Sequence, residues 1–307
     1  MGGPGVIDGF LATFTQYIDS GFGLVQGDVR WLASVLIAVD ITLAGLFWAM
    51  APDEDVLARL IKKTLYIGVF AFIIGHYNNL AQIVYNSFAG LGLKAGGGAI
   101  TAAQLLQPGK LAQVGIDSGK PILTSISGLM GFTSFFDNFV QIAILMIAWL
   151  IVVISFFIMA IQLFVSLIEF KLTTLAGFVL VPFGIFGRTA FLAEKVLGNV
   201  VSSGVKILAL AVIVGIGSTI FGQFTTALNN PPTISDALTP ILAALTILGL
   251  SIFGPGIANG LIAGGPQLGA GATVGTGLAV AGMGAAGVGL AAAGFGAASV
   301  AGGATGG

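Results

Sequence analysis

The longest uncharged stretch of the chain sets the strongest limit on its fold. Between Asp137 and Glu169 lie 31 residues without an Asp, Glu, Lys or Arg. As an α-helix at about 1.5 Å per residue, this stretch is about 46 Å long, which exceeds the roughly 30 Å hydrocarbon core of a bilayer. We therefore expect a helix that crosses a membrane with tilt or projects beyond it.

The rest of the chain shares this apolar character. Of the 307 residues, 56% are hydrophobic and 7% are charged, whereas a typical soluble domain has about 25% charged residues. The mean hydropathy is +1.05 and the net charge is −1. These values exclude an ordinary soluble enzyme, a disordered tail and a basic nucleic-acid binder, and they predict an all-α membrane protein.

The residues that usually carry chemistry are scarce. The chain has no cysteine and one histidine, His76. Disulfides, thiol catalysis, Cys-ligated metals and His-pair metal sites are therefore excluded. We find no phosphate-binding loop, Ser-His-Asp set or paired carboxylates at the required spacing. We expect neither catalysis nor a metal or other cofactor.

Hydropathy predicts about five membrane spans. The first covers residues 31–51, with Trp31 and Trp48 near its ends, where interfacial aromatic residues gather. The remaining four are expected within residues 60–85, 138–168, 207–228 and 239–262.

A separate amphipathic helix is expected before the first span. Apolar residues recur every three or four positions in residues 1–30, which places them on one helical face. No Lys or Arg precedes Arg30, so this region lacks the basic start of a secretory signal. Two placements stay open, the membrane interface and a packed position against the spans of the protein itself.

One apolar segment is too short for an ordinary span. Residues 172–186 are apolar but are broken by glycine and proline. A bent or re-entrant segment fits this length, because irregular backbone at membrane depth has to be buried in protein or face water. The expected turn residues are Pro182, Gly184 and Gly187.

Positive charges favour an external amino terminus. Five spans then place seven Lys and Arg residues inside and four outside, in agreement with the positive-inside rule. Six spans with an internal amino terminus give the same ratio. Three of the four outer charges (Lys94, Lys110 and Lys120) are dispersed in a long loop, and discounting that loop favours five spans.

The predicted organisation has five parts. An amphipathic helix (1–30) precedes two spans (31–87). A periplasmic loop (88–137) follows, with enough apolar residues to form short helices that pack on the membrane or on another protein. The long third helix, the re-entrant segment and the last two spans form a membrane core (138–263), and a Gly/Ala-rich tail (264–307) lies in the cytoplasm.

Polar residues inside the predicted spans are the candidate functional residues. Asp40 lies in the middle of the first span, at a cost of about 2.5–3.5 kcal/mol on insertion scales. It either lines a pathway or couples transport, or it makes a hydrogen-bonded contact between helices. His76, Asn79 and Gln82 form a polar cluster with Asn78 in the second span. A wet crevice and ordinary interhelical hydrogen bonds both explain this cluster.

Small residues mark a candidate packing face on the last span. Gly256, Gly260 and Gly264 are spaced by four, so they share one helical face suited to close helix contact.

Three blocks of sequence resemble a known family. They are LFWAMAPDEDVLARLIKKTLYIGVFAFII, then SFAGLGLKAGGG, and then EFKLTTLAGFVLVPFGIFGRTAFLAEKVLGNV. In this order, over about residues 25–265, they resemble the TrbL family of polytopic inner-membrane subunits of conjugative type IV secretion systems. The Gly/Ala-rich tail departs from that family, whose members often end in a longer polar region.

The resemblance implies a structural or channel subunit of the bacterial inner membrane, with the amino terminus and the loop 88–137 in the periplasm and the tail in the cytoplasm. It implies a homo-oligomeric ring, with five as the expected copy number. This ring would form a platform for the periplasmic stalk, for pilus assembly and for DNA or protein transfer. The implied partners are a minor stalk subunit, pilin, the secretion ATPases, phospholipids and, transiently, the transferred DNA.

Two other functions stay open at this point. A secondary transporter or ion channel, with Asp40 as its coupling residue, would also use polar clusters and broken helices, although we find no convincing internal repeat. An immunity or entry-exclusion protein would use the loop 88–137 as its recognition surface. The secretion-system subunit, the transporter or channel, and the immunity or entry-exclusion protein are all membrane proteins that work without chemical turnover.

Overall fold

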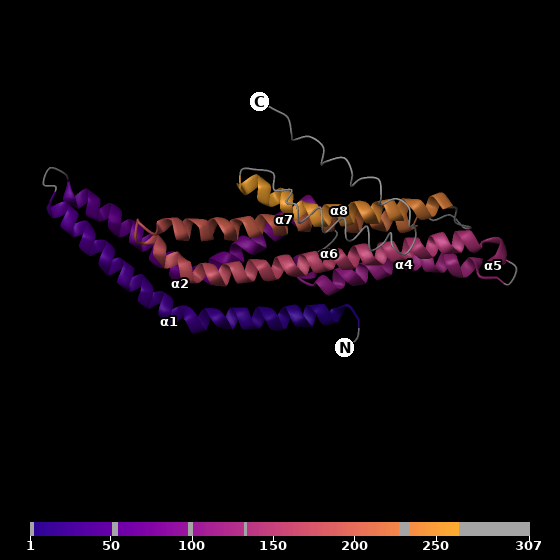
Figure 1. Ribbon diagram of the computed structural model, residues 1–307, viewed down its shortest axis with the longest axis horizontal. Helices are drawn as coiled ribbons and strands as arrows, with labels where there is room; N and C mark the ends of the chain where they lie inside the picture. The colour runs from indigo at the N-terminus through magenta and orange to yellow at the C-terminus, as the bar shows by residue number, and fades with distance from the viewer. Residues whose placement is uncertain (1–2, 51–54, 98–100, 132–133, 227–233, 264–307) are drawn as a thin grey trace, which may run out of the picture. The chain divides into compact units, whose positions relative to one another are not determined.

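The computed structural model describes residues 3–50, 55–97, 101–131, 134–226 and 234–263, and all regular structure in these ranges is helical. The prediction of an all-α membrane protein is confirmed. Figure 1 shows the long helices running side by side along one axis. The tail 264–307 lies outside the described residues.

The first helix, α1 (Gly5–Ala49), is continuous across the boundary expected near residue 30. The predicted amphipathic helix and the predicted first span are therefore two halves of one 45-residue helix, which bends partway along its length (Figure 1). No proline or glycine pair interrupts it around residue 30, so nothing in the backbone ends the helix there. Its first half packs alongside α6, in the second of the two arrangements left open above.

Helix α2 (Val56–Ala95) begins with an effective cap and contains one kink. The Asp55 carboxylate accepts hydrogen bonds from the amides of Leu57 and Ala58 at 3.1 and 3.4 Å, which satisfies two of the free amides of the first turn. At His76 the backbone leaves the helical region, with φ −120° and ψ 16°. The predicted second span, residues 60–85, lies on this helix.

The predicted loop 88–137 is largely helical and packs on the chain itself. Helix α2 extends to Ala95, and α3 (Ala102–Leu105), α4 (Pro108–Leu129) and α5 (Ser134–Asp137) follow it. Helix α4 lies antiparallel to the first half of α6 (Figure 1). The expectation of short helices holds for α3 and α5, whereas α4 is a 22-residue helix whose apolar face is covered by α6.

Helix α6 (Phe139–Leu180) is the central element. It contacts α1, α4, α7 and α8, and it continues without interruption through residues 172–180. A 3-10 turn, η1 (Val181–Gly184), then leads into α7 (Ala190–Thr226), which runs back antiparallel to α6. Helix α8 (Ile234–Ala263) returns antiparallel to α7.

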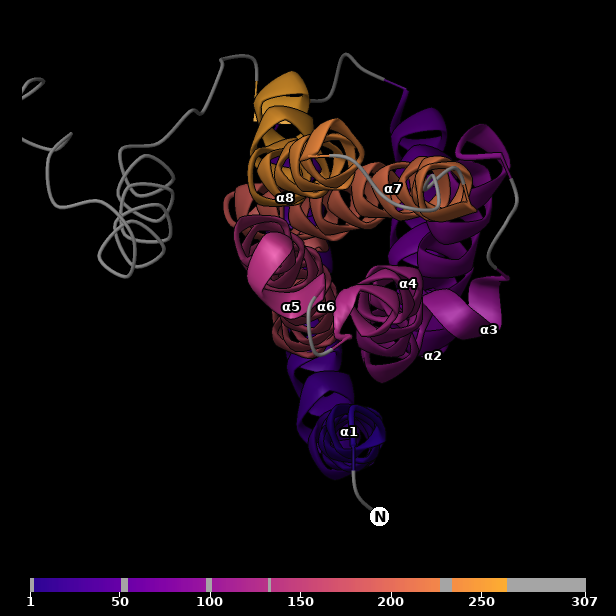
Figure 2. The ribbon, with the colours of Figure 1, turned by 90° about the vertical axis from the view of Figure 1, so that its right-hand side faces the viewer.

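Two hydrophobic cores succeed each other along the helices. The larger core lies mainly among α4, α6, α7 and α8, with a few residues from α1, α2 and α3. It includes the edge-to-face pair Phe156 and Phe221, whose ring centres are 5.2 Å apart. The smaller core joins α1 and α2 to the α6–η1 end, around Phe22 and Phe178. Figure 2, which looks along the helices, shows α1 and α8 on opposite sides of α4 and α6.

Four helices among the described residues are long and apolar enough to cross a membrane. They are Gly5–Ala49, Phe139–Gly184, Ala190–Thr219 and Leu238–Gly260. Four of the five predicted spans lie on these helices, and the fifth lies on α2, which is not among them. Only 11% of the most apolar window of α1 is buried, against 50% for α7, so α1 offers far more apolar surface to lipid or to other proteins.

Candidate functional site

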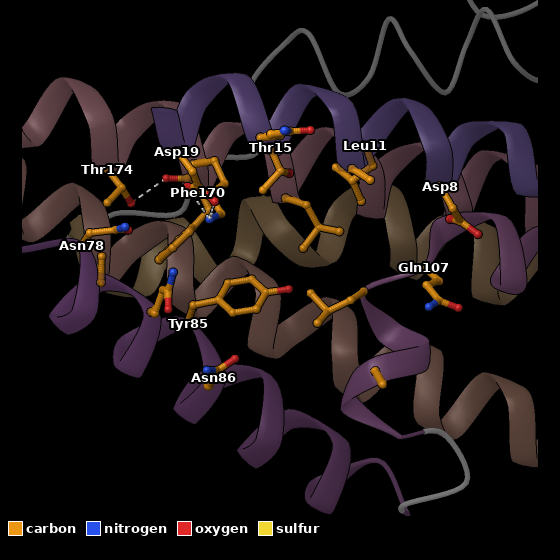
Figure 3. Close-up of a pocket in the computed structure, with 18 of the residues that line it drawn as sticks. Asp8, Leu11, Thr15, Asp19, Asn78, Tyr85, Asn86, Gln107, Phe170 and Thr174 are labelled. Atoms are coloured by element: carbon orange, nitrogen blue, oxygen red, sulfur yellow. Dashed lines mark hydrogen bonds and ion pairs between the residues drawn. The ribbon is translucent and has the colours of Figure 1, made fainter. Parts of the chain in front are cut away.

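A large, open groove with many polar side chains lies between α1, α2 and α6. Its volume is about 980 Å³. One wall is formed by the polar face of α1, with Asp8, Gln16 and Asp19, and the link between α3 and α4 covers part of the opposite side. Figure 3 shows the side chains of α1 and α2 facing each other across it.

The α2 wall of this groove is a stripe of amides. Asn78, Gln82 and Asn86 are spaced by four, so they follow one another along the same helical face. Tyr85 lies between them and points into the space below α1 (Figure 3). Its hydroxyl is buried and has no hydrogen-bond partner in the described protein.

Two ion pairs tie α6 to its neighbours at the level of the groove. Lys171 Nζ lies 2.8 and 3.0 Å from the two carboxylate oxygens of Asp19 on α1. Glu169, two residues earlier, pairs instead with Lys206 on α7. Residues two apart on a helix point in different directions, so Glu169 and Lys171 reach two different neighbours. Together they fix α1 and α7 to opposite sides of α6.

Asp40 is buried and paired. Lys63 Nζ on α2 lies 2.6 Å from Asp40 Oδ2, and the Asp40 side chain is only 6% exposed. The pair joins α1 and α2 near the connection between these two helices. This contact explains how a carboxylate is tolerated in the middle of an apolar helix, because a buried charge needs a partner. Sequence reasoning singled out Asp40 but not its partner.

The polar cluster of α2 is divided between two surfaces. Gln82 lines the groove, whereas His76 and Asn79 are exposed and lie outside the groove lining. The His76 ring stacks on Phe72 at 4.6 Å, and its Nδ1 lies 3.1 Å from the Phe72 carbonyl oxygen. Asn86 and the facing residues of α1 were missed, although a polar stripe at four-residue spacing was a usable signal.

Two glycines at the end of α2 lie close to the backbone of α7. A Cβ added at Gly92 would lie 2.5 Å from the Leu208 carbonyl oxygen, and one at Gly96 would lie 2.9 Å from the Val212 carbonyl oxygen. Glycine therefore lets the two backbones approach closely. These residues belong to the SFAGLGLKAGGG block, in which the four-residue spacing of glycines went unnoticed.

The predicted glycine face of α8 is only partly described. Gly260 is buried and Gly256 is half-buried, while Gly264 lies outside the described residues. At Gly254 of α8, an added Cβ would lie 2.5 Å from Ile213 Cδ1 of α7.

The expected turn residues lie at the connection from α6 to α7. Pro182 and Gly184 are buried in η1, and Gly187 is exposed after it. The Tyr66 hydroxyl of α2 donates a 2.7 Å hydrogen bond to the Gly184 carbonyl. The break in the apolar run is thus a turn held by a third helix, and its re-entry into a membrane stays a prediction.

Within the described ranges, no group of three or more His, Cys, Asp or Glu residues is placed to hold a metal ion. Among the charged side chains near the groove, Asp19 pairs with Lys171, and Asp8 accepts a hydrogen bond from the Gly109 amide of α4. Apolar helices long enough to span a bilayer, joined by ion pairs and close glycine contacts, define a polytopic α-helical membrane protein whose polar residues hold its helices together.

Comparison with known proteins identifies the family. Residues 37–254 match the model of the TrbL/VirB6 plasmid conjugal transfer proteins, and the chain belongs to this family. This range runs from the second half of α1 into α8 and includes α2, α4, α6 and α7 in full. The resemblance read from the sequence is confirmed.

Two curated relatives carry corresponding names. The chain is 29% identical over 246 residues to "Conjugal transfer protein TrbL" of Rhizobium radiobacter, a match that covers 78% of this chain and 58% of the relative. It is 28% identical over 239 residues to "Probable conjugal transfer protein TrbL" of Sinorhizobium fredii (strain NBRC 101917 / NGR234), with 75% and 56% covered. The chain spans little more than half the length of these relatives.

Proposed function

We propose that this protein is an inner-membrane subunit of a conjugative type IV secretion system, where it forms an oligomeric platform for the periplasmic stalk, pilus assembly and DNA or protein transfer. The observation that carries the proposal is the family match over residues 37–254. The partners are a minor stalk subunit, pilin and the secretion ATPases of the same system, with transient contact to the transferred DNA. The protein acts by assembling, without chemical turnover.

The exposed apolar surface of α6 supports assembly. Phe139 at its start is 57% exposed and Val179 near its end is 39% exposed, with further exposed apolar residues between them. These two residues are about 60 Å apart along a helix that rises about 1.5 Å per residue. The hydrocarbon core is only about 30 Å thick, and ordinary tilts shorten the projected length too little to fit. Part of this surface is therefore expected to meet other protein, such as further copies of the chain.

The positions of basic residues support an orientation. The first half of α2 and the turn from α6 to α7 lie at the same end, since Tyr66 binds Gly184 there. Basic residues gather near both of these segments: Arg59, Lys62, Arg188 and Lys195. By the positive-inside rule this end is cytoplasmic. In the proposed orientation the amino terminus, α4 and the end of α7 are then periplasmic, and the tail is cytoplasmic.

The alternative of an ion-coupled transporter gains little from the geometry. Its key residue, Asp40, already has Lys63 within 2.6 Å, so its burial needs no transported ion.

Deletion of the gene from a self-transmissible plasmid tests the proposed role in conjugation. Transfer to recipient cells should fall by several orders of magnitude and return when the gene is supplied in trans, while plasmid copy number stays unchanged. Undiminished transfer would overturn the proposal.

A further inference from the structure

The groove between α1, α2 and α6 carries amide and charged side chains at a place where several neighbouring residues of α1 and α2 expose large apolar side chains. Its lining on α1 and α6 falls within two of the candidate membrane spans, Gly5–Ala49 and Phe139–Gly184. One position further along α1 from the groove residue Gln16, Tyr17 is 75% exposed outside the groove. On α2, Ile83 next to Gln82 is 58% exposed outside it. On both helices, a polar residue of the groove is therefore next in the chain to an exposed apolar residue outside it.

The amide and charged side chains of this groove are poorly suited to contact with lipid. The three amides of the α2 stripe have several donors and acceptors each, and hydrocarbon satisfies none of them. Asp19 and Lys171 pair with each other, yet their side chains are still 35% and 23% exposed. An unsatisfied polar group in an apolar medium costs a few kcal/mol, about 1–3 by mutational measures. Acyl chains in this groove would leave many such groups unsatisfied.

The tyrosines at the floor give an independent indication. Tyr85 lines the groove, and its hydroxyl is buried without a partner in the described protein. Tyr77 is 4% exposed, its hydroxyl is likewise unpartnered, and it lines an adjoining cavity of about 290 Å³ that shares Asp19 and Asn78 with the groove. Buried polar atoms of native proteins are usually satisfied by protein or by ordered water. A volume of about 980 Å³ is ample for many water molecules.

We propose that the α1–α2–α6 groove is a water-filled crevice that carries solvent into the membrane region as far as the Asp19–Lys171 ion pair. Its ligands are water and small polar solutes, and phospholipid acyl chains are excluded from it. The inference concerns this face of a single copy and does not depend on a role in conjugation. It gives one side of the protein a hydrated wall, while the outward faces of α1 and α2 remain apolar.

The absence of native cysteine makes the crevice directly testable. Two pairs of single-cysteine variants compare neighbouring residues of similar depth: Gln82→Cys with Ile83→Cys on α2, and Gln16→Cys with Tyr17→Cys on α1. The chain is expressed alone, and intact membrane vesicles of both orientations are treated with a charged, membrane-impermeant thiol reagent. Labelling after denaturation sets the maximum for each variant.

The crevice predicts that the groove member of each pair reacts at least tenfold faster than its outward neighbour. Equal rates within both pairs, or faster reaction of the outward residues, would overturn the proposal. Occupation by acyl chains would leave the groove members as slow as their neighbours and would count equally against it. The two pairs lie on different helices, so one misfolded variant leaves the other pair decisive.

Discussion

Lys63 Nζ on α2 lies 2.6 Å from Asp40 Oδ2 on α1, and this ion pair joins the two helices near their connection. Few other contacts link α1 directly to α2. The Asp40 side chain is almost fully buried, whereas Lys63 retains 26% of its exposure. The lysine can therefore reach solvent or headgroups with its ammonium group while its stem packs beside α1.

Removing one charge of this pair should be more harmful than removing both. Loss of one partner of a fully buried pair costs about 3–5 kcal/mol, and we expect about 2 kcal/mol for Asp40→Asn because Lys63 is partly exposed. The double variant Asp40→Asn with Lys63→Met should regain most of the stability. Thermal unfolding in mild detergent measures the effect.

The same variants separate packing from transport. If Asp40 works only as a structural partner of Lys63, the double variant should also regain plasmid transfer. A stable double variant that remains inactive would instead favour a coupling role for the carboxylate.

The close approach of α2 and α7 should depend on Gly92. An added methyl at this position meets the Leu208 carbonyl and the Ala211 Cβ at 2.5 and 2.7 Å, so Gly92→Ala should destabilise the protein by about 1–3 kcal/mol through overpacking. Gly90, two residues earlier on the same helix, has open space around its Cα. Gly90→Ala is the matched control and should be neutral or slightly stabilising, because alanine favours the helix. Similar melting temperatures for the two variants would argue against the glycine contact.

The partners assigned to Glu169 and Lys171 can be tested by exchanging charges. Exchanging the two residues within α6, as Glu169→Lys with Lys171→Glu, keeps the composition but puts like charges opposite Asp19 and Lys206. We expect a marked loss of folded chain in membranes. Exchanging the partners across helices, as Glu169→Lys with Lys206→Glu, should preserve most of it. The reverse ranking would mean that Glu169 and Lys171 pair with each other.

Much of the fold could be read from the sequence, because apolar length and helix breakers act locally. The uncharged run before Glu169 predicted the central helix, and Pro182 and Gly184 predicted the turn that ends it. No helix boundary occurs near residue 30. The polar residues in the first half of α1 line the groove on one face of a helix that continues to Ala49. Sequence alone treats such a change in polarity as an end of the helix.

The missed parts of the site depend on contacts between distant residues. Asp40 is conspicuous in an apolar run, but its partner Lys63 looked like an ordinary interfacial lysine. Asp19 and Lys171 are 152 positions apart, and their pairing follows only from the parallel packing of α1 on α6. The helix α4 was expected to cover the membrane or another protein, because nothing in its own pattern identifies α6 as the surface that buries it.

The proposed orientation predicts which cysteine positions are reached from each side of the membrane. Arg188→Cys, in the turn after η1, should react with an impermeant reagent only in inside-out vesicles, because that end carries the basic residues. Lys120→Cys on α4 should react only in intact spheroplasts, which expose the periplasmic face. The two sites are both exposed in the protein, so burial does not confuse the comparison. Labelling of Lys120→Cys from the cytoplasmic side would reverse or refute the orientation.

Assembly is the central claim, and the mass of the particle extracted in a mild detergent tests it most directly. The chain has a mass of 31.0 kDa, and light scattering with detergent correction gives the protein mass independently of shape. We expect a single species with several copies of the chain, five by the expectation drawn from the family. A particle that stays at one copy across detergents, and never associates with stalk or ATPase subunits of its system, would contradict the account.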